Sequence, residues 1–226
     1  MLSVVIPTFE AAEALAATMG AFGEAGAAGI ALEVVVVDAG STDGTPELAG
    51  RLGARLITAE RSRGAQLAAG AAAAGGAWLL FLHADTTPGP GWAAEVARFM
   101  ADPANLRRAA AFRFALDDAG RRARRLEAAV AWRCRVLALP YGDQGLLISR
   151  VFYRELGGFR PIPLMEDVDL VRRIGRRRLA FLDTRAVTSA ARYREAGYVR
   201  RSLRNLACLA LYFLGLPPRL IARLYA

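Results

Sequence analysis

The 226-residue sequence contains no lysine, and all 30 of its basic residues are arginine. This absence excludes Schiff-base chemistry on lysine and the phosphate-binding lysine of P-loops, whereas arginine suits two-pronged contacts with phosphate and contacts with anionic membrane surfaces. The two cysteines, Cys134 and Cys208, lie too far apart in the sequence to form a zinc-type pair. A reducing, cytoplasmic setting is therefore expected.

The start of the given sequence does not have the pattern of a signal peptide, and the sequence has no long hydrophobic run. Residues 1–7 are apolar but have no basic start, so export is not expected. The longest strongly apolar stretch, 206–216, is about half the roughly 20 residues that a membrane-spanning helix needs. With 54% hydrophobic and 23% charged residues, the composition excludes disorder and fits one large α/β domain with a short appendage at most.

Short apolar runs alternate with alanine-rich segments over the first 85 residues. The expected buried strands are 2–6, 32–37 and 78–82, and a further short strand is expected at 54–58. The expected helices are 10–25, one that begins at 45–47, and 62–74. This alternation predicts a Rossmann-like, doubly wound, mostly parallel sheet with helices on both faces. Ligands of such sheets bind beyond the carboxyl ends of the strands, which here hold Thr8, Asp38 and residues 83–85.

The alternation is looser after residue 90. The expected helices are 92–100, 121–139, 151–156 and 166–176, and the expected strands are 110–116, 146–148 and 179–182. Two more helices are expected from residue 195 to the end, broken at the proline pair 217–218.

Polar residues stand at two of the expected strand ends. Asp38 precedes a turn rich in glycine and small hydroxyls. Its carboxylate could accept a hydrogen bond from a nucleobase N–H or a ribose hydroxyl, and the alternative is that it only caps the loop. His83 and Asp85 project to the same side of the chain. The two side chains could bind a divalent cation that is shared with a nucleotide diphosphate. The alternative is that His83 is a structural histidine and that Asp85 caps a turn.

Three acids, Glu166, Asp167 and Asp169, fall within four residues. Adjacent like charges repel, so such a cluster is unfavourable in a helix unless a cation or a proton requires it. A carboxylate at a helix start that faces the ligand crevice can act as a general base. The alternative is an acidic cluster that only complements the helix macrodipole.

The motifs occur in a fixed order along residues 2–193. They are Val4-Val5-Ile6-Pro7-Thr8, Val36-Val37-Asp38 with the turn 40–45, Phe81-Leu82-His83-Ala84-Asp85-Thr86, Gly157-Gly158-Phe159 and Glu166-Asp167-Val168-Asp169-Leu170. Their order and spacing resemble those of family 2 glycosyltransferases. The likeness is strongest to short bacterial members that carry a "HAD" metal motif and a "GDQG" segment, here residues 142–145.

The resemblance implies the GT-A fold and inverting transfer of a sugar, expected from a UDP-hexose, to an acceptor hydroxyl with Mg²⁺ or Mn²⁺. It implies that Asp167 is the general base and that Asp85, with His83, holds the metal. The implied nucleotide-sugar contacts are Pro7, Thr8, Asp38, Arg63, Asp85 and Arg192. The implied acceptor-side residues are Asp143, Gln144, Glu166 and Tyr193.

The same resemblance divides the chain. Residues 1–193 are expected to form the GT-A domain, with a nucleotide-binding half at 1–88 and an acceptor half at 89–193. Residues 194–226 are expected to form C-terminal amphipathic helices.

The sequence departs from the family's pattern at several positions. Glu10-Ala11 replaces the usual Asn-Glu after the first strand, Ala68 replaces an asparagine, and Ser189 replaces a glutamine. These departures leave open a catalytically silent GT-A-like module that binds a membrane or a partner. A sugar-nucleotide pyrophosphorylase is less favoured, because its basic phosphate loop and catalytic lysine are absent.

Arginines cluster at 121–135 and 172–178, but no aromatic interleaving or zinc spacing accompanies them, so nucleic-acid binding is not expected. In the tail, arginines flank the apolar stretch 206–216 and recur at 219 and 223. Such helices suit peripheral contact with the inner face of the cytoplasmic membrane and a lipid-linked acceptor. Packing on the domain, or on a second subunit in a homodimer, is the alternative.

Overall fold

One mixed sheet forms the centre of the computed structural model, which describes residues 1–225. Its strands run in the spatial order β3-β2-β1-β4-β7-β6-β8-β5. Their bounds are β1 (Leu2–Thr8), β2 (Leu32–Asp38), β3 (Arg55–Thr58), β4 (Trp78–Phe81), β5 (Thr86–Pro88), β6 (Ala109–Leu116), β7 (Leu146–Ser149) and β8 (Leu179–Thr188).

The helices connect these strands and extend beyond the last one. Their bounds are α1 (Ala12–Gly20), α2 (Thr45–Arg51), α3 (Arg63–Ala73), α4 (Trp92–Ala101), α5 (Arg121–Leu137), α6 (Arg150–Glu155), α7 (Glu166–Ile174), α8 (Ala191–Ala196), α9 (Tyr198–Phe213) and α10 (Pro218–Tyr225). Short 3₁₀ turns lie at η1 (Ala21–Ala25), η2 (Pro103–Arg107), η3 (Gly142–Gln144) and η4 (Arg176–Arg178).

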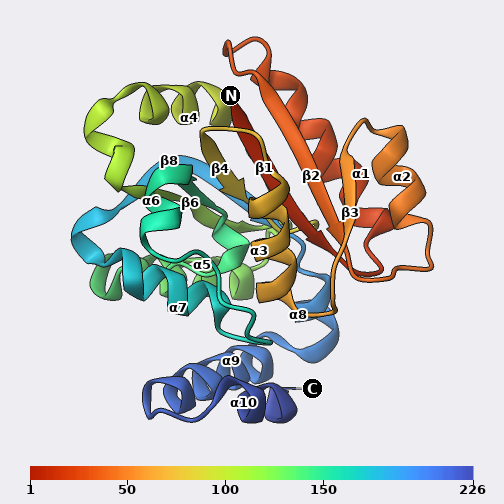
Figure 1. The fold of residues 1–226 in the computed structure, drawn as a ribbon. Coiled ribbons are helices and arrows are strands. Elements are labelled where there is room, and N and C mark those ends of the chain that lie inside the picture. The colour runs from red at the N-terminus through yellow and green to blue at the C-terminus, as the bar shows by residue number, and fades with distance from the viewer. Residues whose placement is uncertain (226) are drawn as a thin grey trace.

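Strands β1 and β4 and the second half of β2 are buried on both faces, whereas the edge strand β3 is mostly exposed. In β1, Val5 packs into the layer of α3, α6 and α7, whereas Val4 and Ile6 pack into the layer of α1, α2 and α4. Strands β3, β2, β1 and β4 are parallel. Strands β2 and β3 lie on one side of β1 and β4 lies on the other, so the direction in which successive strands are added changes at β1. The expected doubly wound α/β fold with helices on both faces is therefore confirmed (Figure 1).

The second half brings distant segments to the carboxyl end of β4. Strand β7 runs antiparallel to β4, with Leu146 opposite Phe81, so η3 lies where β4 ends. Strand β8 is longer than the expected 179–182 and runs parallel to β6. Its end pairs with β5, which the sequence analysis did not predict. A three-residue strand containing proline has no periodicity of its own and forms only through this pairing.

The expected helix over 10–25 is wrong at its two ends. Glu10 takes a φ of 49°, so the α-helix begins only at Ala12. Beyond Gly20 the chain tightens into η1, where glycine weakens an α-helix by about 1 kcal/mol per residue. The expected helix over 166–176 ends earlier, at Ile174, because Gly175 has a φ of 77°.

Helices α9 and α10 lie side by side below the rest of the molecule, and α9 contacts α5 and α8 (Figure 1). Within residues 1–225, the helices are too short or too polar to cross a bilayer.

Candidate active site

One pocket lies at the carboxyl edge of the sheet. It is walled by the ends of β4 and β8, the η3 turn, the start of α7, and one face each of α8 and α9. The residues with functional side chains that line it are Arg63, His83, Asp85, Tyr141, Asp143, Glu166, Asp167, Ser189, Arg192, Tyr193, Arg201, Asn205 and Cys208. Asp85 and Asp167, which are far apart in sequence, therefore face the same hollow.

Asp85 owes its position to the β5–β8 pairing. It directly precedes β5, and its carbonyl oxygen accepts a hydrogen bond of 3.1 Å from the backbone N–H of Ser189. Its carboxylate makes no hydrogen bond or ion pair with the other described residues. The carboxylate is therefore available to a ligand in the pocket.

Asp167 stands in the first turn of α7, after Met165, which takes a φ of 66°. Its Oδ2 atom accepts a hydrogen bond of 2.8 Å from the backbone N–H of Gly142. Its Oδ1 atom accepts one of 2.7 Å from the N–H of Val168. Each oxygen keeps an acceptor site for an incoming hydroxyl proton, and the two backbone bonds fix the orientation of the carboxylate.

His83 lies between the β4 end and η3. Burial, together with the positive charges of Arg63 and Arg192, lowers the pKa of its imidazole well below the ordinary value. The ring is therefore neutral at physiological pH, which is the state in which histidine binds metal ions.

Asp143 follows Gly142 in η3, and its Oδ1 atom is buried without a hydrogen-bond partner in the described structure. Burial is the main cause that raises the pKa of this carboxyl to about 6, and the negative charges of Asp167 and Asp85 add to the effect. An unpartnered polar atom at a pocket wall is a candidate contact for a ligand hydroxyl.

Glu166 lines the pocket but is only 1% exposed. Its Oε1 atom lies 3.6 Å from a guanidinium nitrogen of Arg63 on α3. Burial raises the pKa of Glu166 to about 7, although the charge of Arg63 acts in the opposite direction. The pair links α3 to α7, but the Oε1 atom has no hydrogen-bond partner in the described structure, so the acceptor-side role of Glu166 stays a prediction.

Gln144 is turned away from the pocket, contrary to the expectation of an acceptor-side role. It is 2% exposed, and its amide nitrogen donates to the Phe112 carbonyl oxygen at 3.0 Å. Its amide oxygen accepts from Arg133 and from the Cys134 thiol, both at 3.3 Å. Gln144 therefore ties η3 to β6 and α5, and this fixes the turn that carries Gly142.

The residues expected at the nucleoside, Pro7, Thr8 and Asp38, lie outside this pocket at the neighbouring ends of β1 and β2. Asp38 accepts four hydrogen bonds at 2.6–3.0 Å, from the Thr8 hydroxyl, the Gly40 N–H and the hydroxyl and N–H of Ser41. Burial raises the pKa of Asp38, but these bonds lower it by more, so the pKa lies below its ordinary value. All four acceptor sites are occupied, so a nucleobase N–H would have to displace one donor.

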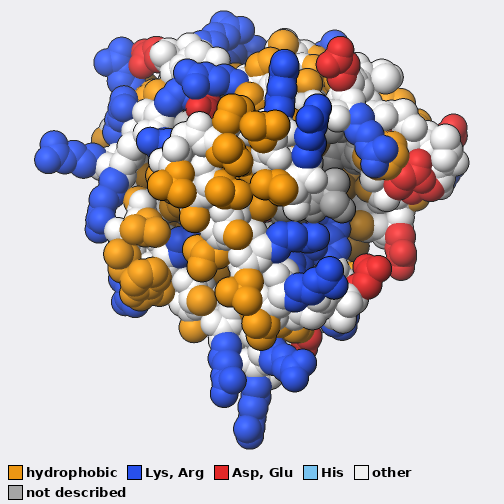
Figure 2. Space-filling model, turned by 90° about the horizontal axis from the view of Figure 1, so that it is seen from below, with side chains coloured by type: hydrophobic (Ala, Val, Ile, Leu, Met, Phe, Trp, Pro, Cys, Tyr) orange, Lys and Arg blue, Asp and Glu red, His pale blue; other side chains and the backbone are white. Residues whose placement is uncertain are grey.

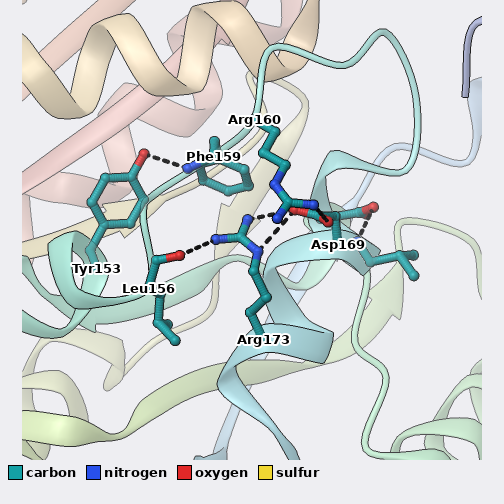
Figure 3. A network of polar contacts seen from close by, with 8 residues as sticks. Tyr153, Leu156, Phe159, Arg160, Asp169 and Arg173 are labelled. Carbon is teal, nitrogen blue, oxygen red and sulfur yellow. Dashed lines mark hydrogen bonds and ion pairs between the residues drawn. The ribbon is translucent and has the colours of Figure 1, made fainter.

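A polar network around Asp169, whose labelled residues do not line the pocket, holds the first turns of α7 (Figure 3). The Asp169 carboxylate accepts from Arg160 at 3.0 Å and from Arg173, whose guanidinium also donates to the Leu156 carbonyl oxygen. Asp169 is therefore structural, and of the three acids at 166, 167 and 169 only Asp167 is not fully buried where it lines the pocket.

The residues of α8 and α9 form the remaining wall. Arg192 and Tyr193, expected from the sequence, are joined there by Arg201 and Asn205. The sequence analysis placed Arg201 only among the arginines that flank the apolar stretch 206–216, and it did not name Asn205. The available signal was the four-residue spacing of Arg201 and Asn205, which places both on one face of the helix.

Asp85 and His83 fit a divalent cation. Mg²⁺ and Mn²⁺ are commonly held by one or two protein groups together with water and substrate phosphates. Asp85 offers an unengaged carboxylate and His83 a neutral imidazole. Residues 1–225 contain no cluster of three or more metal-ligating side chains, so an ion here would depend on a ligand's phosphates for further oxygens.

Solved structures with the same arrangement of strands and helices are glycosyltransferases of the GT-A class. Glucosyl-3-phosphoglycerate synthase from Mycobacterium tuberculosis, crystallised with Mn²⁺, UDP and glucosyl-3-phosphoglycerate, is 22% identical with a TM-score of 0.64, covering 96% of this chain and 81% of that one. A mannosyltransferase from Pyrobaculum calidifontis, crystallised with GDP-mannose and Mn²⁺, is 22% identical with a TM-score of 0.65, covering 92% and 60%. No curated protein sequence matches significantly.

The sequence profile of glycosyl transferase family 2 matches residues 3–150. The chain therefore belongs to glycosyltransferase family 2, and the fold expected from its motifs is the fold observed.

Proposed function

We propose that this protein transfers a hexose from a nucleotide diphosphate sugar, a UDP-hexose, to an acceptor hydroxyl with inversion at the anomeric carbon, assisted by Mg²⁺ or Mn²⁺. The observation that carries the proposal is that Asp85 and Asp167 line one pocket from different walls. The two carboxylates suit different tasks, because one is unengaged and the other is oriented by backbone N–H groups.

In this proposal Asp167 removes the proton from the acceptor hydroxyl while the hydroxyl oxygen bonds to the anomeric carbon. The bond from that carbon to the diphosphate oxygen breaks, and the nucleotide diphosphate leaves with the electron pair. The metal ion supplies charge neutralisation of the leaving diphosphate when it is bound. Asp85 and His83 would hold the ion, and Arg192, on the same wall as Ser189, would contact the phosphates.

The experiment separates the two carboxylates. Asp85→Asn is expected to abolish Mn²⁺-dependent UDP binding, measured by calorimetry with and without chelator. Asp167→Asn is expected to bind Mn²⁺ and UDP as the wild type does, but to slow donor hydrolysis and transfer at least a hundredfold, followed by NMR. The anomeric configuration of the product, read in the same spectra, tests inversion.

Two results would contradict the proposal. Full activity in Asp167→Asn would show that Asp167 is not the general base. The absence of any nucleotide-sugar binding would favour the catalytically silent module. Asp102→Asn, which changes an exposed acid outside the pocket, serves as the control for both measurements.

The lower face supports a second part of the proposal, peripheral contact with an anionic membrane and a lipid-linked acceptor. Large apolar side chains are exposed on α9, on α10 and on the residue that follows α9: Val199, Leu203, Leu206, Phe213, Leu214, Leu220 and Leu224. Residues 196–226 contain no acid and five arginines. Figure 2 shows the apolar side chains gathered at the centre of this face with arginines around them.

An apolar surface ringed by arginine matches the chemistry of an anionic bilayer, whose headgroups attract cations while the interface accepts apolar groups. Leu203 and Leu214 are 61% and 83% exposed, so replacing both with serine leaves the core intact. The double variant is expected to lose at least tenfold in binding to phosphatidylglycerol vesicles, measured by sedimentation. Leu106→Ser, at a 50% exposed position away from α9 and α10, is the matched control.

Unchanged vesicle binding in the double variant would refute membrane contact through this face. A concentration-dependent dimer that the same two substitutions dissolve would instead assign the face to a second subunit.

A further inference from the structure

The α9 wall of the pocket carries two polar atoms that the described part of the chain leaves unsatisfied. The Nε atom of Arg201 and the Oδ1 atom of Asn205 are both buried, and neither has a hydrogen-bond partner there. Both residues line the pocket that contains Asp85 and Asp167. Buried polar groups of folded proteins are nearly always satisfied, so an unsatisfied pair at a pocket wall indicates a missing ligand.

The guanidinium of Arg201 is held in place rather than loosely exposed. It lies 5.1 Å from the ring centroid of Tyr193. The Tyr193 ring stacks on that of Tyr198 with centroids 5.4 Å apart, and the Tyr198 hydroxyl donates to Asp118. Ring stacking uses the face of the guanidinium and leaves its N–H groups free to donate.

The charge around Arg201 is not balanced locally. Residues 196–226 contain no acid, and no described carboxylate lies within ion-pair distance of this guanidinium. The pocket's carboxylates stand on other elements, at the β4 end, η3 and α7. A guanidinium that is held beside a pocket and has no carboxylate partner suits an anionic ligand.

The two unsatisfied atoms differ in what they need. Arg201 Nε is a donor and suits an anionic oxygen, whereas Asn205 Oδ1 is an acceptor and suits a hydroxyl. The two residues are one helical turn apart and on one face of α9, so a single small group can meet both. A phosphate or carboxylate next to a hydroxyl satisfies this pair of requirements.

We infer that Arg201 and Asn205 form an acceptor subsite for an anionic alcohol, in which a phosphate or carboxylate lies close to the hydroxyls of the acceptor. The inference rests on the proposed transferase function and names its substrate class. The anionic group is bound on the α9 wall, and the accepting hydroxyl faces Asp167 across the pocket. The same chemistry occurs in soluble sugar phosphates and in phosphoglycerol lipid headgroups.

The test uses the full chain saturated with Mn²⁺ and UDP. Glycerol 3-phosphate and glucose 6-phosphate are compared with glycerol and glucose by ligand-observed NMR titration. The phosphorylated alcohols are expected to bind at least tenfold more tightly than the neutral ones. Arg201→Gln is expected to remove this preference, and Asn205→Ala to weaken both phosphorylated probes at least threefold. Arg200→Gln, at the exposed neighbouring position outside the pocket, is expected to keep the preference.

Three results would overturn the subsite: equal binding of neutral and phosphorylated alcohols, no binding of either phosphorylated probe, or loss of Mn²⁺–UDP affinity in Arg201→Gln. The last would assign Arg201 to the donor. If the wild type fails to bind Mn²⁺ and UDP at all, the transferase proposal fails instead. Competition by phosphatidylglycerol vesicles for the subsite would assign the anionic group to a lipid headgroup, and binding without such competition would assign it to a soluble acceptor.

Discussion

His83 and Gly142 approach so closely that a Cβ atom on residue 142 would lie 2.6 Å from the His83 Nε2 atom. The same Cβ would lie 3.6 Å from the Asp167 Oδ2 atom. Glycine at this position therefore lets the imidazole, the η3 turn and the Asp167 carboxylate share one small volume. The contact joins the proposed metal side of the pocket to the proposed base side.

Gly142→Ala tests this contact. The methyl group would push the imidazole away, since real Cβ contacts under 3.0 Å essentially do not occur. We expect Mn²⁺-dependent UDP binding, measured by calorimetry, to weaken at least tenfold while the thermal unfolding transition stays cooperative. Gly50→Ala is the control, because a Cβ there meets nothing within 4 Å. That variant should bind as the wild type does and gain about 0.5–1 kcal/mol in stability. Wild-type binding in Gly142→Ala would show that the position of His83 does not matter to the nucleotide.

The first half of the fold could be predicted from the sequence because its signals are local. The valine run of β2 and the apolar run of β4 are buried on both faces, and such runs indicate parallel strands. The ligand edge followed from the same reasoning, since Asp38 and His83 stand where strands end.

The pairing that completes the site could not be predicted in this way. Asp85 is fixed by β5, which exists only through its pairing with β8, about a hundred residues later. The predicted orientation of Gln144 toward the acceptor was wrong, because the direction of a side chain in a 3₁₀ turn depends on distant partners, here Phe112 on β6. The role of Arg201 depends on where α9 packs, and periodicity within a helix does not specify its neighbours.

Asp169→Asn tests the network that fixes α7 (Figure 3). The Asp169 side chain is 9% exposed and binds both Arg160 and Arg173. Removing one partner of a buried pair leaves charge uncompensated, so we expect a loss of about 2–3 kcal/mol in urea unfolding. Asp183→Asn removes the partner of Arg113 at an 84% exposed position and should cost at most about 0.5 kcal/mol. Equal losses in the two variants would contradict a special role for Asp169.

Asp38→Asn tests the loop after β2. The Oδ2 atom of Asp38 accepts from the N–H groups of Gly40 and Ser41, both at 2.8 Å, and a side-chain amide cannot accept at both of its terminal atoms. The amide NH₂ group would face the Thr8 and Ser41 hydroxyls, which would have to accept instead of donate, and the bonds from the two N–H groups would lose their assistance by charge. We therefore expect a loss of about 1–3 kcal/mol at pH 7. The pKa of Asp38 lies below its ordinary value of 3.8, so its contribution is present above pH 3.8 and is lost as the pH falls further. Stability measured by urea unfolding at pH 7 and pH 3 should therefore differ less for the variant than for the wild type. An unchanged difference would mean that the loop does not depend on this charge.

Glu166 and Glu95 should give opposite pH dependences of stability. Burial raises the pKa of Glu166 from 4.5 to about 7, so the folded state holds its proton more tightly than the unfolded state does. Its stabilising effect is complete below pH 4.5 and is lost as the pH rises to about 7. Glu166→Gln should therefore gain stability relative to the wild type over this interval, by up to about 3 kcal/mol.

Glu95 is also partly buried, which raises its pKa, but hydrogen bonds from Thr184 and the Asp183 N–H lower it by more. The contribution of Glu95 to the stability of the folded state is present above pH 4.5 and is lost as the pH falls below that value. Glu95→Gln should therefore be less stable than the wild type at pH 7, and the deficit should shrink on acidification. Urea unfolding at pH 4, 5.5 and 7 measures both variants. Parallel pH profiles would show that burial does not control the protonation of Glu166, and the α3–α7 contact through Arg63 would then be an ordinary ion pair.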